Sequence, residues 1–124
     1  MLAAEDKDAP VAFVLAMVRW LYSDEPLDEM AYLASYPIAV QGPGNGLTLM
    51  GVEQLIDALN VFRRAAAAMG IARVESEVVS LSNTIDGLVV VTIENQRFAR
   101  DGRSLGSHRS TYVVVWEAPY WRIR

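Results

Sequence analysis

Histidine titrates near neutral pH and can therefore move protons, and this chain contains a single one, His108. A tyrosine hydroxyl within hydrogen-bond reach would complete an acid–base pair, and the candidate partners are Tyr36 and Tyr112. The alternative is that His108 is a solvated histidine beside the turn at residues 102–106. These three residues are the candidate catalytic groups, and the alternative stays open.

Two arginines on strand-like segments, Arg97 and Arg109, could hold a carboxylate or a phosphate through two-point hydrogen bonds. Arginines on strands also pair with acids at the protein surface, and Glu94 and Glu75 are nearby acids of that kind. Surface pairing is the interpretation that we adopt for Arg109. For Arg97, both interpretations remain open.

Other polar side chains could orient a ligand in an otherwise apolar cavity, which is the usual composition of a small-molecule site. For Trp20 and Tyr112 the competing interpretation is packing, with the polar atom bonded to the backbone. The candidate ligand-binding residues are Trp20, Gln41, Asn95, Arg97 and Ser110.

Several kinds of chemistry find no support. The chain has no cysteine, which excludes disulfides, thiolate metal sites and cysteine nucleophiles. One histidine without clustered acids does not make a zinc site, so neither a metal nor a cofactor is expected. The series Gly42, Gly44 and Gly46 lacks the lysine and the spacing of a phosphate-binding loop. No serine has the sequence context of a nucleophile elbow.

The residues that could form a site must share one face of a sheet. Side chains alternate between the two faces along a strand, so a strand places every second residue on the same side. We place the following residues on the cavity side: Val91, Ile93, Asn95 and Arg97 of one strand, and His108, Ser110, Tyr112 and Val114 of the next. An error of one residue would invert this assignment.

Hydrophobic periodicity predicts an α+β order of elements. Helices are expected over residues 9–22 and 52–69, with a shorter helix between them that begins near the acidic residues 24–29. A hairpin is expected over 37–41 and 47–50 with its turn at Asn45-Gly46. Antiparallel strands follow over 71–83, 88–99, 105–117 and 120–124, joined at Asp86-Gly87, Asp101-Gly102 and Ala118-Pro119. Gly70 should end the long helix, and Ala65 to Ala68 should let it lie close against the sheet.

This order resembles the nuclear transport factor 2-like (SnoaL-like) family, whose cystatin-like fold wraps a curved sheet around helices to form a cone. The resemblance covers residues 9–124 and has three local likenesses: a hairpin followed by a helix that starts at Gly51, the long strands, and the ending Trp121-x-Ile123. It implies one domain over residues 1–124 with a flexible tail at 1–8. It also implies a short hairpin plus four strands around three helices, a cavity inside the cone, and a homodimer through the outer face of the sheet.

The resemblance also allows the isomerase chemistry of that family to be compared residue by residue. Its isomerases keep a carboxylate base where this chain has Gly42, and an acid on the third long strand where this chain has residues 110–112. Their tyrosine on the first helix falls near Trp20. Glycine cannot accept a proton, so ketosteroid isomerase activity is not expected.

Composition limits the setting in which the protein works. Hydrophobic residues make up 52% of the chain, an apolar excess that could cover a ligand cavity or a subunit interface. The net charge is −4 and the arginines are scattered, so nucleic acid is not an expected partner. The acidic start and the absence of a long apolar run predict a cytoplasmic protein without a membrane span.

Three functions remain. The first is a small-molecule-binding protein that uses the cone cavity. The second is an acid–base enzyme of the same fold, of isomerase, cyclase, dehydratase or hydrolase type, acting on a small apolar or carboxylated substrate. The third is a protein-interaction module whose cavity is filled by side chains.

Overall fold

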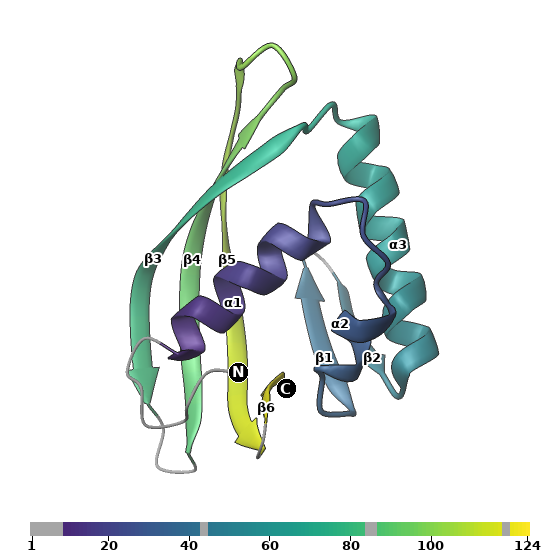
Figure 1. The fold of residues 1–124 in the computed structure, drawn as a ribbon, viewed down its shortest axis with the longest axis vertical. Coiled ribbons are helices and arrows are strands. Elements are labelled where there is room, and N and C mark those ends of the chain that lie inside the picture. Colours follow the sequence, from purple (N-terminus) through teal and green to yellow (C-terminus); the bar gives the residue numbers. More distant parts are fainter. Residues whose placement is uncertain (1–8, 43–44, 84–86, 118–119) are drawn as a thin grey trace.

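The computed structural model describes residues 9–42, 45–83, 87–117 and 120–124. Over these residues the chain forms two helices, a hairpin, a long helix and then four strands, which is the predicted order (Figure 1). The helices are α1 (Ala9–Leu21), α2 (Asp28–Tyr32) and α3 (Val52–Ala68), and the strands are β1 (Ile38–Gly42), β2 (Asn45–Leu49), β3 (Arg73–Asn83), β4 (Leu88–Phe98), β5 (Ser104–Glu117) and β6 (Tyr120–Ile123).

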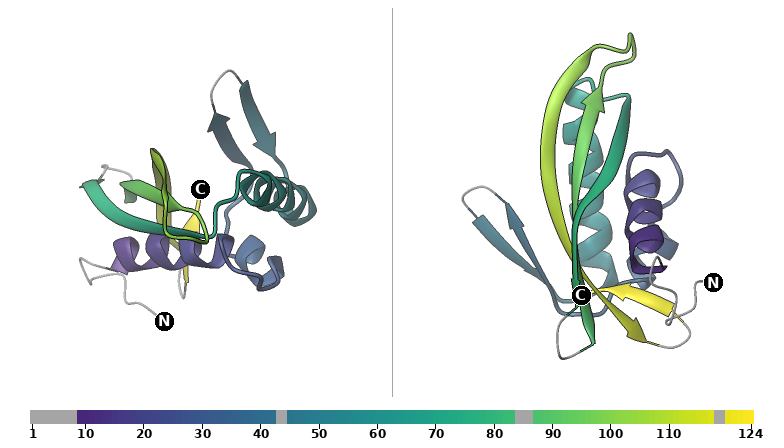
Figure 2. Two further views of the ribbon diagram at one scale, coloured as in Figure 1. Left: turned by 90° about the horizontal axis from the view of Figure 1, so that it is seen from above. Right: turned by 90° about the vertical axis from the view of Figure 1, so that its left-hand side faces the viewer.

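The long strands form one curled antiparallel sheet in the order β3-β4-β5-β6, while β1 and β2 pair only with each other. A bridge between Ala34 and Ile123 connects the segment before the hairpin to β6. Seen from above, α1 lies along one face of the long sheet, and α3 stands beyond its edge (Figure 2). The α+β fold class, with three helices and a curled antiparallel sheet, is confirmed.

The predicted assignment of the inner face of the sheet is also confirmed. Val91 and Ile93 are fully buried and pack against Val14 and Val18 of α1. Burying each such side chain contributes about 1.5–3 kcal/mol. Trp121 of β6 belongs to the same core, so the closing strand helps to cover the end of the sheet.

An arginine on α3 fastens this helix to the end of α1. The guanidinium of Arg63 donates hydrogen bonds to the carbonyl oxygens of Trp20 (2.7 Å), Leu21 (2.9 Å) and Glu25 (2.8 Å). The last carbonyl groups of a helix have no partner within the helix, so a cation that binds them stabilises both elements. Arg63 therefore fixes where α3 stands relative to α1.

The prediction that Ala65 to Ala68 bring α3 close against the sheet is wrong. Among these four alanines only Ala66 is buried, and Phe62 and Met69 on the same helix remain 38% and 58% exposed. The small side chains leave space between the helix and the sheet instead of closing it. The end of α3 is as predicted: Gly70 adopts a φ of 77°, and the N–H of Ile71 donates to the carbonyl of Ala66.

The predicted hairpin forms, but its turn is not at Asn45-Gly46. Asn45 pairs with Gly42 and Gly46 pairs with Gln41, so both residues belong to β2. The physical reason is register: these pairs place Asn45 and Gly46 within the strand ladder, and residues 43–44 lie outside the described residues. The turn at Asp101-Gly102 is confirmed, because Gly102 has a φ of 89° and the Asp101 carboxylate accepts from the N–H of Arg103. The predicted tail at 1–8, Asp86 and the predicted turn at 118–119 also lie outside the described part of the chain.

Candidate functional site

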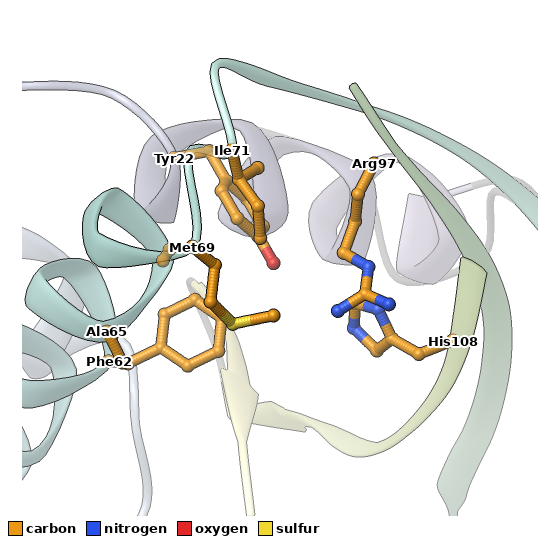
Figure 3. Close-up of a pocket in the computed structure, with 8 residues that line it drawn as sticks. Tyr22, Phe62, Ala65, Met69, Ile71, Arg97 and His108 are labelled. Carbon is orange, nitrogen blue, oxygen red and sulfur yellow. The ribbon is translucent and has the colours of Figure 1, made fainter. Parts of the chain in front are cut away.

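A pocket of about 210 Å³ lies between α3 and the inner face of the sheet, beside the end of α1 (Figure 3). Its α3 side is apolar, and its opposite side is formed by one polar residue from each of two neighbouring strands, Arg97 of β4 and His108 of β5. The pocket is lined by Tyr22, Phe62, Ala65, Ala66, Met69, Ile71, Arg97 and His108.

A bulge in the sheet places Arg97. Gln96 pairs with Ser107 and Phe98 pairs with Ser104, so two residues of β5, Leu105 and Gly106, stand opposite Arg97. A bulge of this kind re-aims the side chain beside it. Gly106 has a φ of 93°, a conformation that glycine adopts without strain.

The guanidinium of Arg97 is held loosely. Its Nη2 donates to the carbonyl of Leu105 over a long distance of 3.4 Å, and its buried Nε has no hydrogen-bond partner among the described residues. The ion pairs in the described part of the chain join Arg73 to Glu75, Arg109 to Glu94 and Arg122 to Glu117, and none involves Arg97. The surface interpretation of Arg109 is thereby confirmed, since it lies 3.6 Å from Glu94.

A buried asparagine orients His108 from behind. Asn95 is 2% exposed, and its Oδ1 accepts a hydrogen bond of 2.6 Å from Ser76. Its Nδ2 donates to Ser110 at 3.1 Å and lies 3.3 Å from Nε2 of His108. An amide nitrogen can only donate, so Nε2 of the imidazole is the acceptor and the proton of the neutral ring is on Nδ1.

His108 therefore keeps a donor, Nδ1–H, in the wall of the pocket. This nitrogen is buried and has no hydrogen-bond partner among the described residues. Burial lowers the pKa of His108 from its ordinary 6.5, and the positive charge of Arg97 lowers it further. The neutral ring is thus the dominant form at pH 7.

Tyr22 lies across the pocket from Arg97 and His108 (Figure 3). Its ring meets that of Phe62 edge to face with 5.5 Å between centroids, and its hydroxyl points into the pocket (Figure 3). Burial raises the pKa of Tyr22, as does the neighbouring Tyr112, while Arg97 opposes the rise. Tyr22 is consequently a neutral hydroxyl that can donate to or accept from a ligand.

The structure brings together only some of the predicted site residues. Arg97 and His108 line the pocket. Asn95 hydrogen-bonds to His108 and is itself held by Ser110. Tyr112 packs against the core, where burial raises its pKa and hydrogen bonding to Ser110 partly offsets the rise.

Two predicted residues lie elsewhere, with their polar atoms bonded to backbone carbonyls. Trp20 donates to Pro26 at 3.0 Å, and the Tyr36 hydroxyl donates to Ala31 at 2.7 Å. The side chain of Gln41 lies outside the described part of the structure.

The apolar wall was missed by sequence reasoning. Phe62 and Met69 belong to the apolar stripe of the helix predicted over residues 52–69, and Tyr22 is the last residue of the helix predicted over residues 9–22. The available signal was the run of alanines next to these large residues, because small side chains beside large ones on one helix leave a hollow.

Metal ligation and membrane spanning each need a recognisable arrangement of residues. Within the described residues, no group of three or more His, Asp or Glu side chains could hold a metal ion. None of the helices that the structure describes has the length and the apolar character needed to cross a membrane.

The fold and the pocket together define a small α+β protein with a site between a helix and the inner face of a curled sheet. The family model described as NTF2-like protein (DUF6841) matches residues 12–124. The chain belongs to this nuclear transport factor 2-like family, as the order of its elements predicted.

Solved structures with low sequence identity share the fold. The protein Aln2 from a Streptomyces species has a TM-score of 0.67 and 16% identity, with 100% of this chain and 90% of that chain covered. A protein from Catenulispora acidiphila, solved in complex with S-DNPA, has a TM-score of 0.61 and 17% identity, with coverage of 94% and 90%. A cystatin-like protein from Caulobacter vibrioides has a TM-score of 0.53 and 18% identity, with coverage of 91% and 81%.

One curated relative matches by sequence. The glycine–tRNA ligase beta subunit of Pseudomonas fluorescens is 31% identical over 96 residues, which make up 77% of this chain. The match spans only 13% of that protein's length.

Proposed function

We propose that the protein binds a small organic molecule in the pocket between α3 and the inner face of the sheet. The observation that carries the proposal is the contrast between the two walls: apolar side chains of α3 face two buried nitrogen donors, Arg97 Nε and His108 Nδ1, that lack partners among the described residues. An apolar pocket with a few convergent polar groups is the usual form of a ligand site. The Catenulispora acidiphila protein of the same fold, which was solved in complex with S-DNPA, supports the same function.

Filling the pocket tests this proposal. Ala65 lines the pocket on α3, whereas Ala67 is exposed on the same helix and does not line it. A set of single-ring fragments would be screened by ligand-observed NMR against Ala65→Trp, with Ala67→Trp as the matched control. We expect fragments bound by the unmodified protein to lose binding in the first variant and keep it in the second. Equal binding to both variants would place the ligand elsewhere and contradict the proposal.

Acid–base catalysis on a small apolar or carboxylated substrate is the second candidate, favoured by the position of His108 in the pocket wall. The tautomer argues against His108 as a base, because Nε2 accepts from the Asn95 amide and Nδ1 already carries the proton. Tyr36 donates to the backbone away from the pocket, so Tyr22 would be the hydroxyl partner. Nitrogen chemical shifts that place the proton of His108 on Nε2 would favour this candidate over simple binding.

The third candidate, an interaction module with a filled cavity, has less support because the pocket is not filled by side chains.

Self-association is a separate proposal: we propose a homodimer through the outer face of the long sheet. Val90 of β4 and Val113 of β5 pair on that face, next to a hydrogen-bonded pair of threonines, Thr92 and Thr111. A cytoplasmic location is likewise proposed, on the absence of cysteine from the sequence.

A further inference from the structure

The wall formed by Arg97 and His108 contains two buried hydrogen-bond donors that have no acceptor among the described residues. Leaving a buried donor without a partner is energetically unfavourable, and this wall holds two such nitrogens, Nε of Arg97 and Nδ1 of His108. Both come from the same end of the same sheet face, on neighbouring strands. A single group with two acceptor atoms could satisfy both.

The charge of this wall is positive and uncompensated within the described structure. A guanidinium carries a positive charge in proteins, and the ion pairs of the described residues join other arginines to their acids. The remaining titratable groups that face His108 are Tyr22 from the segment directly after α1 and Tyr112 from β5, and burial raises the pKa of both, so they are neutral. The α3 side contributes Phe62, Ala65, Ala66 and Met69, which carry no charge.

We propose that the ligand is a small carboxylic acid whose carboxylate is held by Arg97 and His108 and whose apolar body packs against Phe62 and Met69. This inference rests on the proposed binding function and specifies its ligand class. One carboxylate oxygen would accept from the guanidinium and the other from Nδ1–H of the imidazole. Charge-assisted bonds of this kind are the stronger class of hydrogen bond.

The loose attachment of Arg97 allows the carboxylate to reach both donors. In the free protein both nitrogens are buried in the wall, and within the described structure a single long bond to the Leu105 carbonyl holds the guanidinium in place. A turn of the Arg97 side chain toward the pocket would expose Nδ1 of His108. Gly106 adds no side chain behind it: a Cβ built there would lie 3.5 Å from Arg97 Nη2.

The size of the pocket limits the body of the ligand. Its volume of about 210 Å³ is below the roughly 300–1,000 Å³ of pockets that enclose drug-sized molecules. A single ring or a short branched chain next to the carboxylate is therefore the expected size. The Tyr22 hydroxyl, which points into the pocket toward Arg97 and His108, would meet a polar group of the ligand (Figure 3).

Phenylacetate and its neutral amide, phenylacetamide, have nearly the same shape but differ in charge, so comparing them isolates the contribution of the charge. We expect calorimetric titration to show phenylacetate binding at least about tenfold more tightly than the amide, since a charged hydrogen bond contributes about 1.5–3 kcal/mol. Arg97→Met should abolish this preference. Arg109→Met, a change on the outer face of the same sheet, should leave it intact.

The pH dependence of binding distinguishes a direct contact between the carboxylate and His108 from an indirect effect of the substitution on the structure. A bound carboxylate opposes the influence of Arg97 and raises the pKa of His108, so binding should take up protons and tighten as the pH falls from the pKa of the complex toward the lower pKa of the free protein. His108→Gln should remove this pH dependence while Arg109→Met retains it.

The carboxylate inference and the proposed binding function can fail separately. Equal affinity for the acid and the amide, with both lost in Ala65→Trp, would overturn the carboxylate inference and leave the binding function standing. No binding of either probe at millimolar concentration would overturn the inference, while other fragments could still occupy the pocket. Acid preference that survives Arg97→Met would also overturn it.

Discussion

The protonation state of His108 determines what the pocket wall offers a ligand. With its proton on Nδ1 the neutral ring accepts from Asn95 through Nε2 and keeps a buried donor in the pocket wall. If the ring takes up a second proton, Nε2 becomes a donor, and the Asn95 amide must turn so that its oxygen faces the ring. Ser76 and Ser110, which bond to the two ends of that amide, are hydroxyls that can donate or accept. The network can therefore accommodate both states of His108.

NMR titration of His108 tests this picture directly, because a single histidine gives ring signals that need no assignment. We expect its pKa in the folded protein to lie below 6.5, with nitrogen shifts that report the proton on Nδ1. Arg97→Met should raise this pKa, since it removes the nearby positive charge. Arg109→Met serves as the control and should leave the pKa unchanged. A folded-state pKa above 6.5 would contradict the effect of burial, and nitrogen shifts that report the proton on Nε2 would contradict the tautomer.

The same shift affects stability at acidic pH. The folded protein holds the His108 proton more weakly than the unfolded chain, so the unfolded state binds more protons as the pH falls below about 6.5. The contribution of His108 to stability is fully present above that pH and is lost as the pH falls to the folded-state pKa. Urea unfolding at a series of pH values, compared between the unmodified protein and His108→Gln, should show a smaller loss in the variant over this window.

The alternation of side chains along a strand was sufficient to place Asn95 and Arg97 on the same face of the sheet. This face is the buried one, because it also carries Val91 and Ile93. The alternation could not tell which of these residues meet empty space. That depends on where α3 stands, and the stripe of Phe62 and Met69 has the same spacing whether it is packed in a core or faces a cavity. Trp20 and Tyr36 show the same limit: their polar atoms bond to nearby backbone carbonyls, which no spacing reveals.

At the level of elements, the position of α3 depends on Arg63. This side chain crosses from α3 to the end of α1 and binds carbonyl groups of Trp20, Leu21 and Glu25. Tyr22, which follows directly in the chain, lines the pocket together with Phe62 of α3. One contact thus ties two walls of the pocket together.

Replacing Arg63 with methionine should destabilise the fold by about 1.5–3 kcal/mol, since it leaves helix-end carbonyls without a charged donor. Arg64→Met is the matched control, because Arg64 is the next residue on α3 and is exposed. Urea unfolding monitored by tryptophan fluorescence would measure the difference, and the control should stay within about 0.5 kcal/mol of the unmodified protein. Equal effects of the two substitutions would show that the Arg63 contacts do not hold α3.

At the scale of the whole molecule, the two faces of the long sheet have different roles. The inner face packs against α1 and, beyond it, lines the pocket. The outer face carries ion pairs toward one end, including Arg109–Glu94, and valines with a threonine pair toward the other. The order of the elements was readable from the sequence because each has a strong local pattern. The separation of α3 from the sheet was not, because it results from contacts between residues more than 40 positions apart, such as Arg63 and Trp20.

We predict self-association through the valine and threonine end of the outer face. Val113 pairs with Val90 at the centre of that end, so a charge there would have to be buried against a partner molecule. We expect sedimentation to show a dimer for the unmodified protein and a monomer for Val113→Lys. Glu94→Lys, near the ion-paired end of the same face, is the control that should remain dimeric. A monomer at micromolar concentration before any substitution would refute the dimer, and fragment binding to that monomer would show that the pocket works without a partner subunit.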